Sequence, residues 1–166
     1  MITTAVRGMQ LARANLVREM SRATDVGGVT VGIQEGVGIH PGTNQRPGTG
    51  ETVAEVGAKN HFGSKADNIP PRPWLDRGLE VAQPEINRIV QRYGATLPLE
   101  EVLAMIGKVA QESIQQYIED LQTPPNSPQT IAIKGSANPL VDSGVMMNSI
   151  TWEYVETLPP EGIDAG

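Results

Sequence analysis

The chain has 166 residues, of which 39% are hydrophobic and only 4% aromatic, with 18 Gly and 13 Pro, a composition that predicts one domain with a modest core and long loops. The absence of cysteine excludes disulfides, thiolate metal sites and a cysteine nucleophile. A formal net charge of −6 argues against a protein that grips nucleic acid, because such binding relies on Lys and Arg.

The N-terminal segment is predicted to form an amphipathic helix over residues 4–23, because apolar residues recur there at three- and four-residue spacings. Residues 1–24 carry four Arg against one Glu, a balance of +3, whereas residues 98–121 carry one Lys against five carboxylates, a balance of −4. We take Arg7, Arg13 and Arg18 as interface candidates that meet acidic segments of a neighbouring copy. Solvated helix faces are the alternative.

A short strand over residues 29–33 is predicted next, because β-branched residues alternate there. A Gly- and Pro-rich loop follows at residues 35–50, longer than a simple connector. It lacks the phosphate-binding loop pattern, so we expect it to dock on a partner instead. The interface candidates in this loop are His40, Pro41, Gly42, Thr43, Asn44, Gln45, Arg46, Pro47 and Gly48.

A helix from residue 51 to about 61 is predicted, with Thr49 or Gly50 as its cap, Gly63 at its end, and Val53, Val56 and Phe62 on one side. We expect His61 to lie near its C-terminal dipole, and two histidines are too few for a zinc site.

Three prolines determine the backbone conformation predicted for residues 70–73. Residues 70–72 cannot be helical, since a residue that precedes proline is extended, and Pro73 is placed to be the first helical residue. Trp74 is expected to anchor the core, with a contact at an interface as the alternative. We expect Arg72 to pair with a core-facing carboxylate, whose identity the sequence leaves open. We expect one helical stretch that is interrupted at Pro84 and closed by Gly94.

The longest apolar stripe predicts a helix over residues 98–121, and a shorter helix is expected from Pro128 to Gly135. A strand over residues 148–155 should place Ile150, Trp152 and Tyr154 on one face. The predicted fold is therefore α+β: an N-terminal helix, a small mostly antiparallel sheet, two or three further helices and a C-terminal strand. It forms one domain over residues 1–157, followed by a tail over 158–166.

The run Asp142-Ser143-Gly144 matches the active-site turn of aspartic proteases. Those enzymes need two such carboxylates, and this chain has a single such turn, so only a homodimer would serve. The alternative is a structural turn that leads into the last strand, in which Asp142 and Ser143 accept backbone N–H bonds and Gly144 supplies permissive dihedral angles.

Several short motifs resemble, in the same order, the neck and tail-completion proteins of long-tailed bacteriophages, also called virion morphogenesis proteins. They comprise Ile69-Pro70-Pro71-Arg72-Pro73-Trp74-Leu75, then Ser127-Pro128 through Lys134-Gly135, and Asn138-Pro139-Leu140-Val141-Asp142-Ser143-Gly144 through Ser149-Ile150. Pro71, Arg72, Pro73, Trp74, Asp142, Ser143 and Gly144 are the structural-motif residues. Ser143 and Met146 stand where the family usually has Thr and Leu.

The resemblance implies a non-enzymatic virion protein without metal or cofactor, assembled in the host cytoplasm. Such a subunit forms a ring, commonly six-fold, that completes the tail and joins it to the head-side connector. The expected partners are further copies of the chain, the adjoining connector or stopper, and the tail-tube or terminator proteins. Double-stranded DNA would pass through the lumen without specific binding. A tail-terminator or other neck ring component is the near alternative. With neither a membrane-spanning run nor a signal-peptide layout in the sequence, we expect a soluble, non-secreted protein.

Overall fold

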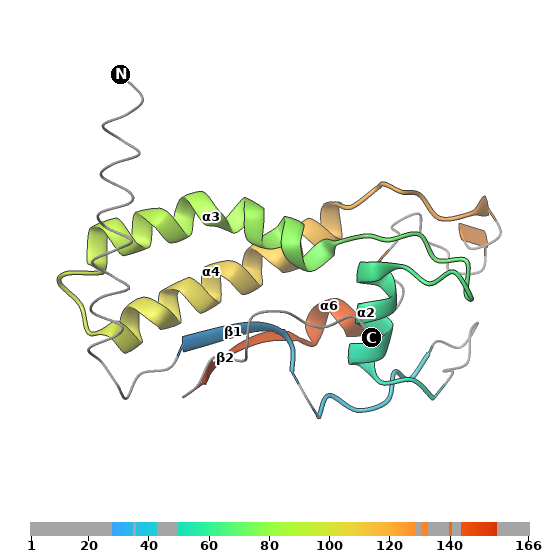
Figure 1. Ribbon diagram of the computed structural model, residues 1–166, viewed down its shortest axis with the longest axis horizontal. Helices are drawn as coiled ribbons and strands as arrows, with labels where there is room; N and C mark the ends of the chain where they lie inside the picture. The colour runs from blue at the N-terminus through green and yellow to red at the C-terminus, as the bar shows by residue number, and fades with distance from the viewer. Residues whose placement is uncertain are drawn as a thin grey trace, which may run out of the picture.

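The computed structural model describes residues 28–34, 36–42, 50–128, 131–132, 140 and 144–155. Its elements are β1 (Gly28–Ile33), α2 (Val53–Phe62), α3 (Trp74–Tyr93), α4 (Leu99–Asp120), α6 (Val145–Asn148) and β2 (Ile150–Val155). Helix α4 lies between α3 on one side and the two strands on the other, while α2 and α6 lie together at the end of the molecule where α3 begins (Figure 1). This arrangement confirms the predicted α+β class.

Helices α3 and α4 pack closely against each other along the molecule. The two helices approach closely at Gly78, where an added Cβ would lie 2.6 Å from the Cα of Ile114. A short turn joins the two helices, and in it the Gly94 N–H donates to the Val90 carbonyl at 2.9 Å. The helix predicted over residues 98–121 is confirmed as α4 (Leu99–Asp120).

The predicted interruption at Pro84 is wrong, because α3 runs as one helix through it. Pro84 is exposed, so its ring lies toward solvent. Ala82 and Ile89, only 1% and 4% exposed, are buried on either side of Pro84 along the helix. We attribute the continuity of the helix to this burial, which offsets the loss of one backbone hydrogen bond.

The two strands form an antiparallel pair with Val31 opposite Trp152 and Ile33 opposite Ile150. The face of β2 that was predicted to carry Trp152 and Tyr154 lies against α4. The Trp152 ring lies over Gly107, where an added Cβ would approach it to 2.6 Å, and the Tyr154 hydroxyl donates to the Glu100 carbonyl. Ile150 is fully buried whereas Tyr154 is 48% exposed. The strand is therefore anchored most firmly at its start.

A short helix precedes β2 and was not predicted. Gly144 adopts a left-handed φ of 74° and is followed by α6 (Val145–Asn148), so the expected direct passage from turn to strand is wrong. The helix buries Met146, which is 4% exposed. Gly144 is suited to this start because glycine tolerates the left-handed region at little cost.

Two predicted helices fall largely or wholly outside the described residues. The helix at residues 4–23 lies outside them entirely. Of the helix expected from Pro128 to Gly135, the structure describes Pro128, Ile131 and Ala132, and the Ile131 N–H donates to the Ser127 carbonyl at 3.0 Å. The tail over residues 158–166 also lies outside the described part.

Helix α2 is capped by Thr52, not by Thr49 or Gly50 as predicted. The Thr52 hydroxyl accepts from the Glu55 N–H at 3.2 Å, and the Glu55 carboxylate accepts from the Thr52 N–H at 2.7 Å. This reciprocal pair is a capping box. It lowers the pKa of Glu55, first through the Thr52 backbone N–H and then through the Thr52 hydroxyl.

Thr52→Ala should destabilise the fold by about 1 kcal/mol, because it leaves a helix N–H without its acceptor. Since the folded-state pKa of Glu55 is depressed, its contribution is present at neutral pH and lost as pH falls through that pKa. Urea denaturation of the wild type and of Glu55→Gln between neutral and acidic pH checks this. A stability difference between the two that stays constant with pH would contradict the capping role of the ionised carboxylate.

Candidate assembly surface and the core that supports it

The motif residues that are far apart in the sequence meet in one core. The buried cluster joins Trp74 at the start of α3 to Leu140, Met146 and Ile150 in the last motif, and Ile114 on α4 completes the contact. Ile114 and Ile150 are fully buried. The core thus lies where α2, α6, the start of α3 and the second half of α4 come together. Of the predicted turn residues, Asp142 and Ser143 lie outside the described part.

Trp74 is a core residue, as predicted. Its side chain is 4% exposed, and its indole N–H donates to the Gly57 carbonyl on α2 at 3.0 Å. The ring meets the His61 ring edge-on, with 5.8 Å between the ring centroids. Trp74 therefore ties α3 to α2.

Arg72 is buried. The prediction that it pairs with a carboxylate is wrong among the residues that the structure describes, because its partners there are a backbone carbonyl and a side-chain amide. The Arg72 Nε donates to the Pro124 carbonyl at 3.2 Å, and a terminal nitrogen donates to the Asn126 side-chain oxygen at 3.5 Å. Burial lowers the pKa of Arg72, but arginine stays protonated in proteins. The side chain thereby joins the start of α3 to the segment after α4. Pro73 precedes α3 as its cap residue and is not the first helical residue as predicted.

His61 lies in the last turn of α2, as predicted, and is 9% exposed. Its Nε2 is 3.4 Å from the Asp76 carboxylate, while its Nδ1 is buried without a hydrogen-bond partner. Within the described ranges, no group of three or more His, Cys, Asp or Glu side chains is placed to hold a metal ion. We therefore assign His61 to packing beside Trp74.

The long loop leaves and returns at the N-terminal end of α2. The His40 N–H donates to the Glu51 carbonyl at 2.7 Å, and the Val53 N–H donates to the Gly38 carbonyl at 3.1 Å. The His40 ring nitrogen Nδ1 also accepts from the Gly42 N–H at 3.1 Å, which places the first predicted loop residues. The remaining interface candidates lie outside the described residues: Arg7, Arg13, Arg18, Thr43, Asn44, Gln45, Arg46, Pro47 and Gly48.

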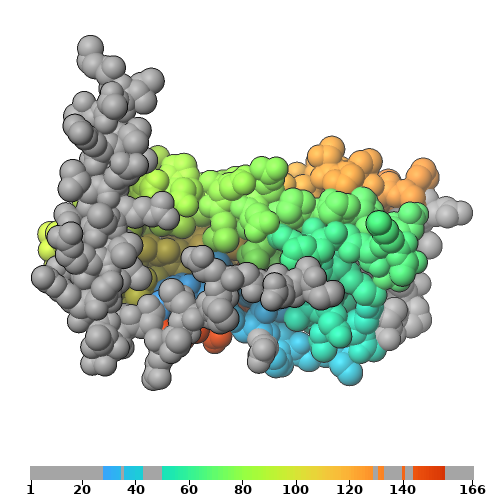
Figure 2. Space-filling view, viewed as in Figure 1, coloured from blue at the N-terminus to red at the C-terminus, as the bar shows by residue number. Residues whose placement is uncertain are grey.

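An exposed apolar surface lies on α2 and on the neighbouring start of this loop. Phe62 is 53% exposed, and Ala54 and Ala58, also exposed, precede it at four-residue spacing on one side of α2. Ile39, 65% exposed, bridges to Thr52 beside the start of the helix. We call Ile39, Ala54, Ala58 and Phe62 the α2 surface. Figure 2 shows α2 in teal and the loop residues 36–42 in light blue next to each other on the visible face.

The prediction that Phe62 shares a face with Val53 and Val56 is wrong, and helix geometry gives the reason. Phe62 follows Val53 by two and a half helical turns, which places it on the opposite side of the helix. Val53 is 2% exposed and belongs to the core. Counting turns from Val53 would have identified Phe62 as a surface residue.

Lys59 on α2 forms ion pairs with residues on both sides of the helix in the sequence. Lys59 contacts the Glu51 carboxylate before the helix and lies 2.8 Å from the Asp67 carboxylate after it. Hydrogen bonds to Asp67 and then to Glu51 raise the pKa of Lys59. Each such exposed pair adds little stability, but together the contacts fix the loop base and the turn after α2 relative to the helix.

Comparison of the chain with protein-family models, curated proteins and solved structures gives no match. None of the helices in the described part is long and apolar enough to cross a membrane.

Proposed function

We propose that the chain is a ring-forming subunit of the neck of a long-tailed bacteriophage, which completes the tail and joins it to the head-side connector. The observation that carries the proposal is the convergence of the resembling motifs on one core. Trp74 belongs to the first motif, Ile150 belongs to the last, and both pack in the cluster that includes Ile114. Such convergence is expected if the motifs mark one fold and not chance matches.

The charge distribution supports a passive role toward DNA. The chain carries a net charge of −6, and α4 holds five carboxylates and one lysine. A negatively charged lumen repels the phosphates of a duplex and lets it slide, whereas a binding protein neutralises them.

The α2 surface is the part of the described chain that we assign to contacts between copies. It combines two exposed large apolar residues with small residues that allow close approach of a partner. Cyclic rings use two different faces of each subunit, so the α2 surface would provide one of them.

Ring formation should be lost when the α2 surface is made polar. We expect the wild type to give six-fold mass in native mass spectrometry and ring-shaped particles in negative stain, and Phe62→Ser with Ile39→Ser to reduce both. Val81→Ser is the matched control, because Val81 is 62% exposed on α3, outside this surface. A monomeric wild type under assembly conditions, tested with its neck partners, would count against the ring. A ring in the double variant would count against the assigned surface.

Deletion of residues 41–48 should block the joining of heads to tails while the melting temperature stays nearly unchanged. The deletion leaves Thr49-Gly50 between His40 and Glu51, whose backbones are already hydrogen-bonded, so a two-residue connection replaces the loop. In vitro head–tail joining and thermal unfolding are the measurements. Full joining activity of the deletion variant would show that the loop is not a docking arm.

A further inference from the structure

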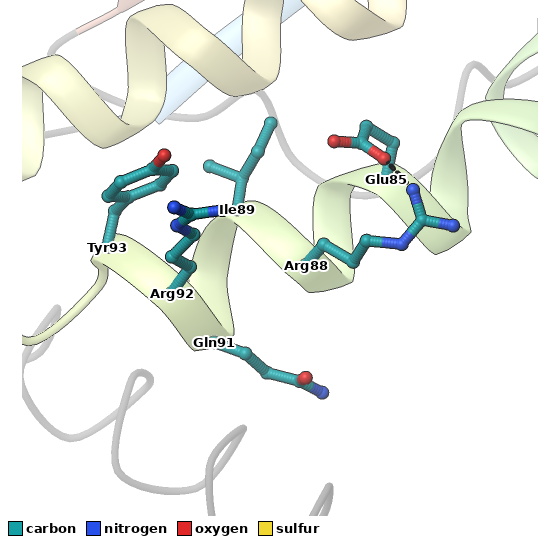
Figure 3. A pocket seen from close by; sticks show the side chains of 6 residues that line it. All are labelled: Glu85, Arg88, Ile89, Gln91, Arg92 and Tyr93. Carbon is teal, nitrogen blue, oxygen red and sulfur yellow. Dashed lines mark hydrogen bonds and ion pairs between the residues drawn. The ribbon is translucent and has the colours of Figure 1, made fainter.

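A shallow hollow lies beside the second half of α3. Its described lining consists of Glu85, Arg88, Ile89, Gln91, Arg92 and Tyr93 (Figure 3), and it encloses a volume of about 360 Å³. Ile89 and Tyr93 extend toward α4, while Arg88 extends along the outside of the helix (Figure 3). The hollow therefore has an apolar floor and a cationic rim.

The chemistry of the lining selects an acidic peptide with apolar residues. The Arg92 guanidinium carbon lies 5.4 Å from the centre of the Tyr93 ring, and Arg88 pairs with Glu85. Two arginines against one carboxylate leave the rim with a net positive charge. Guanidinium groups bind carboxylates through paired hydrogen bonds, and a tyrosine ring offers a flat surface to proline.

Residues 156–166 of this chain have that composition. They include Glu156, Glu161 and Asp164 with no Lys or Arg, and they contain Leu158 and the pair Pro159-Pro160. Residues 1–27, which also lie outside the described part, carry four arginines against two carboxylates, Glu19 and Asp25, and this net positive charge is disfavoured by the cationic rim.

The segment also starts at the correct end of the molecule. Strand β2 ends at Val155, and the neighbouring Tyr154 contacts Glu100 at the beginning of α4. The C-terminal end of α3 lies at the same end (Figure 1). Residues 156–166 span up to about 36 Å when fully extended, which is enough to pass from the strand layer across α4 to α3, since packed layers lie about 10 Å apart.

We propose that residues 156–166 bind in this hollow on the same chain, with Glu161 and Asp164 at Arg88 and Arg92 and the two prolines against Tyr93. The tether favours the chain's own segment, because an attached ligand has an effective concentration in the millimolar range. The proposal goes beyond the ring assignment and does not depend on it.

Paramagnetic broadening in the full-length protein tests the contact. The chain has no cysteine, so Ala165→Cys carries a single spin label. We expect the amide signals of residues 88–93 to lose more than half of their intensity, and to recover in Arg88→Glu with Arg92→Glu. Adding Glu161→Lys and Asp164→Lys to that variant should restore the broadening. Arg77→Glu, at the other end of α3, is the control and should change nothing.

The remaining outcomes separate the alternatives. Absence of broadening at residues 88–93, or broadening that survives the arginine substitutions, would overturn the proposal. Contacts between molecules are detected in a mixture of two samples. One is isotope-labelled and carries no spin label, and the other carries the spin label at natural isotope abundance. Broadening of residues 88–93 that persists in that mixture would assign the hollow to a neighbour's segment and overturn binding within one chain.

Discussion

Gly78→Ala is expected to lower the free energy of unfolding by about 2 kcal/mol, although alanine is the better helix former. Alanine gains roughly 1 kcal/mol in a helix relative to glycine. At Gly78, however, the new Cβ would lie 2.6 Å from the Cα of Ile114 and 2.8 Å from its Cγ1. The closest atom belongs to backbone, so the two helices must separate. Overpacking of a core costs roughly 1–3 kcal/mol, and we expect the upper end of that range or more.

Guanidinium chloride unfolding measures the effect, and Val81→Ala provides the control on the same helix. Val81 is 62% exposed, so its truncation should change stability by less than about 0.5 kcal/mol. The slope of the unfolding free energy against denaturant should stay constant in both variants. A Gly78→Ala protein that is as stable as the wild type would contradict the close crossing of α3 and α4.

The sequence predicted helices and strands well where their side chains alternate between core and solvent. The helix at residues 98–121 and the strand ending at Val155 follow from apolar spacing alone, and both match the structure within a few residues. Pro84 misled the prediction because a single-residue rule took no account of Ala82 and Ile89, which are buried on either side of it. Tertiary packing there outweighed local propensity.

The close contacts made by glycines inside helices could not be predicted from the spacing of apolar residues. Gly57, Gly78 and Gly107 each lie against a side chain or backbone of another element, at 2.6–2.7 Å from a constructed Cβ. From the sequence, a glycine within a helix indicates only a loss of helix propensity. Its partner, such as Trp152 above Gly107, is set by the tertiary fold.

The assignment of surface residues was the least predictable part. Phe62 was expected on the same side of its helix as Val53, yet it belongs to the exposed α2 surface. Arg72 was expected to meet a carboxylate, and it meets the Pro124 carbonyl and the Asn126 amide instead. These partners lie more than fifty positions away in the sequence, so no local pattern indicates them. Spacing predicts which side of an element is apolar; it does not specify the group that an isolated polar residue will contact.

Trp74→Ala is expected to destabilise the protein by about 3–5 kcal/mol, as for other buried aromatic residues that are truncated in a core. Trp74 is 4% exposed, and it belongs to the cluster that also buries Ile114 and Ile150. Trp74→Phe should cost about 1–2 kcal/mol, because it keeps an aromatic ring but removes the hydrogen bond to the Gly57 carbonyl. Urea unfolding followed by circular dichroism measures both values.

The variants Trp74→Ala and Trp74→Phe also distinguish a role of Trp74 in the core from a role in contacts between copies. If Trp74 anchors the core, Trp74→Phe should still assemble with wild-type stoichiometry under conditions in which it stays folded, because Trp74 is only 4% exposed and offers little surface to a second copy. A phenylalanine variant with wild-type stability that fails to assemble would instead place Trp74 in a contact between copies. A loss below about 1 kcal/mol for Trp74→Ala would contradict its burial, since surface substitutions typically fall in that range. The resembling motif would then mark an interface and not the core that joins α2, α3 and β2.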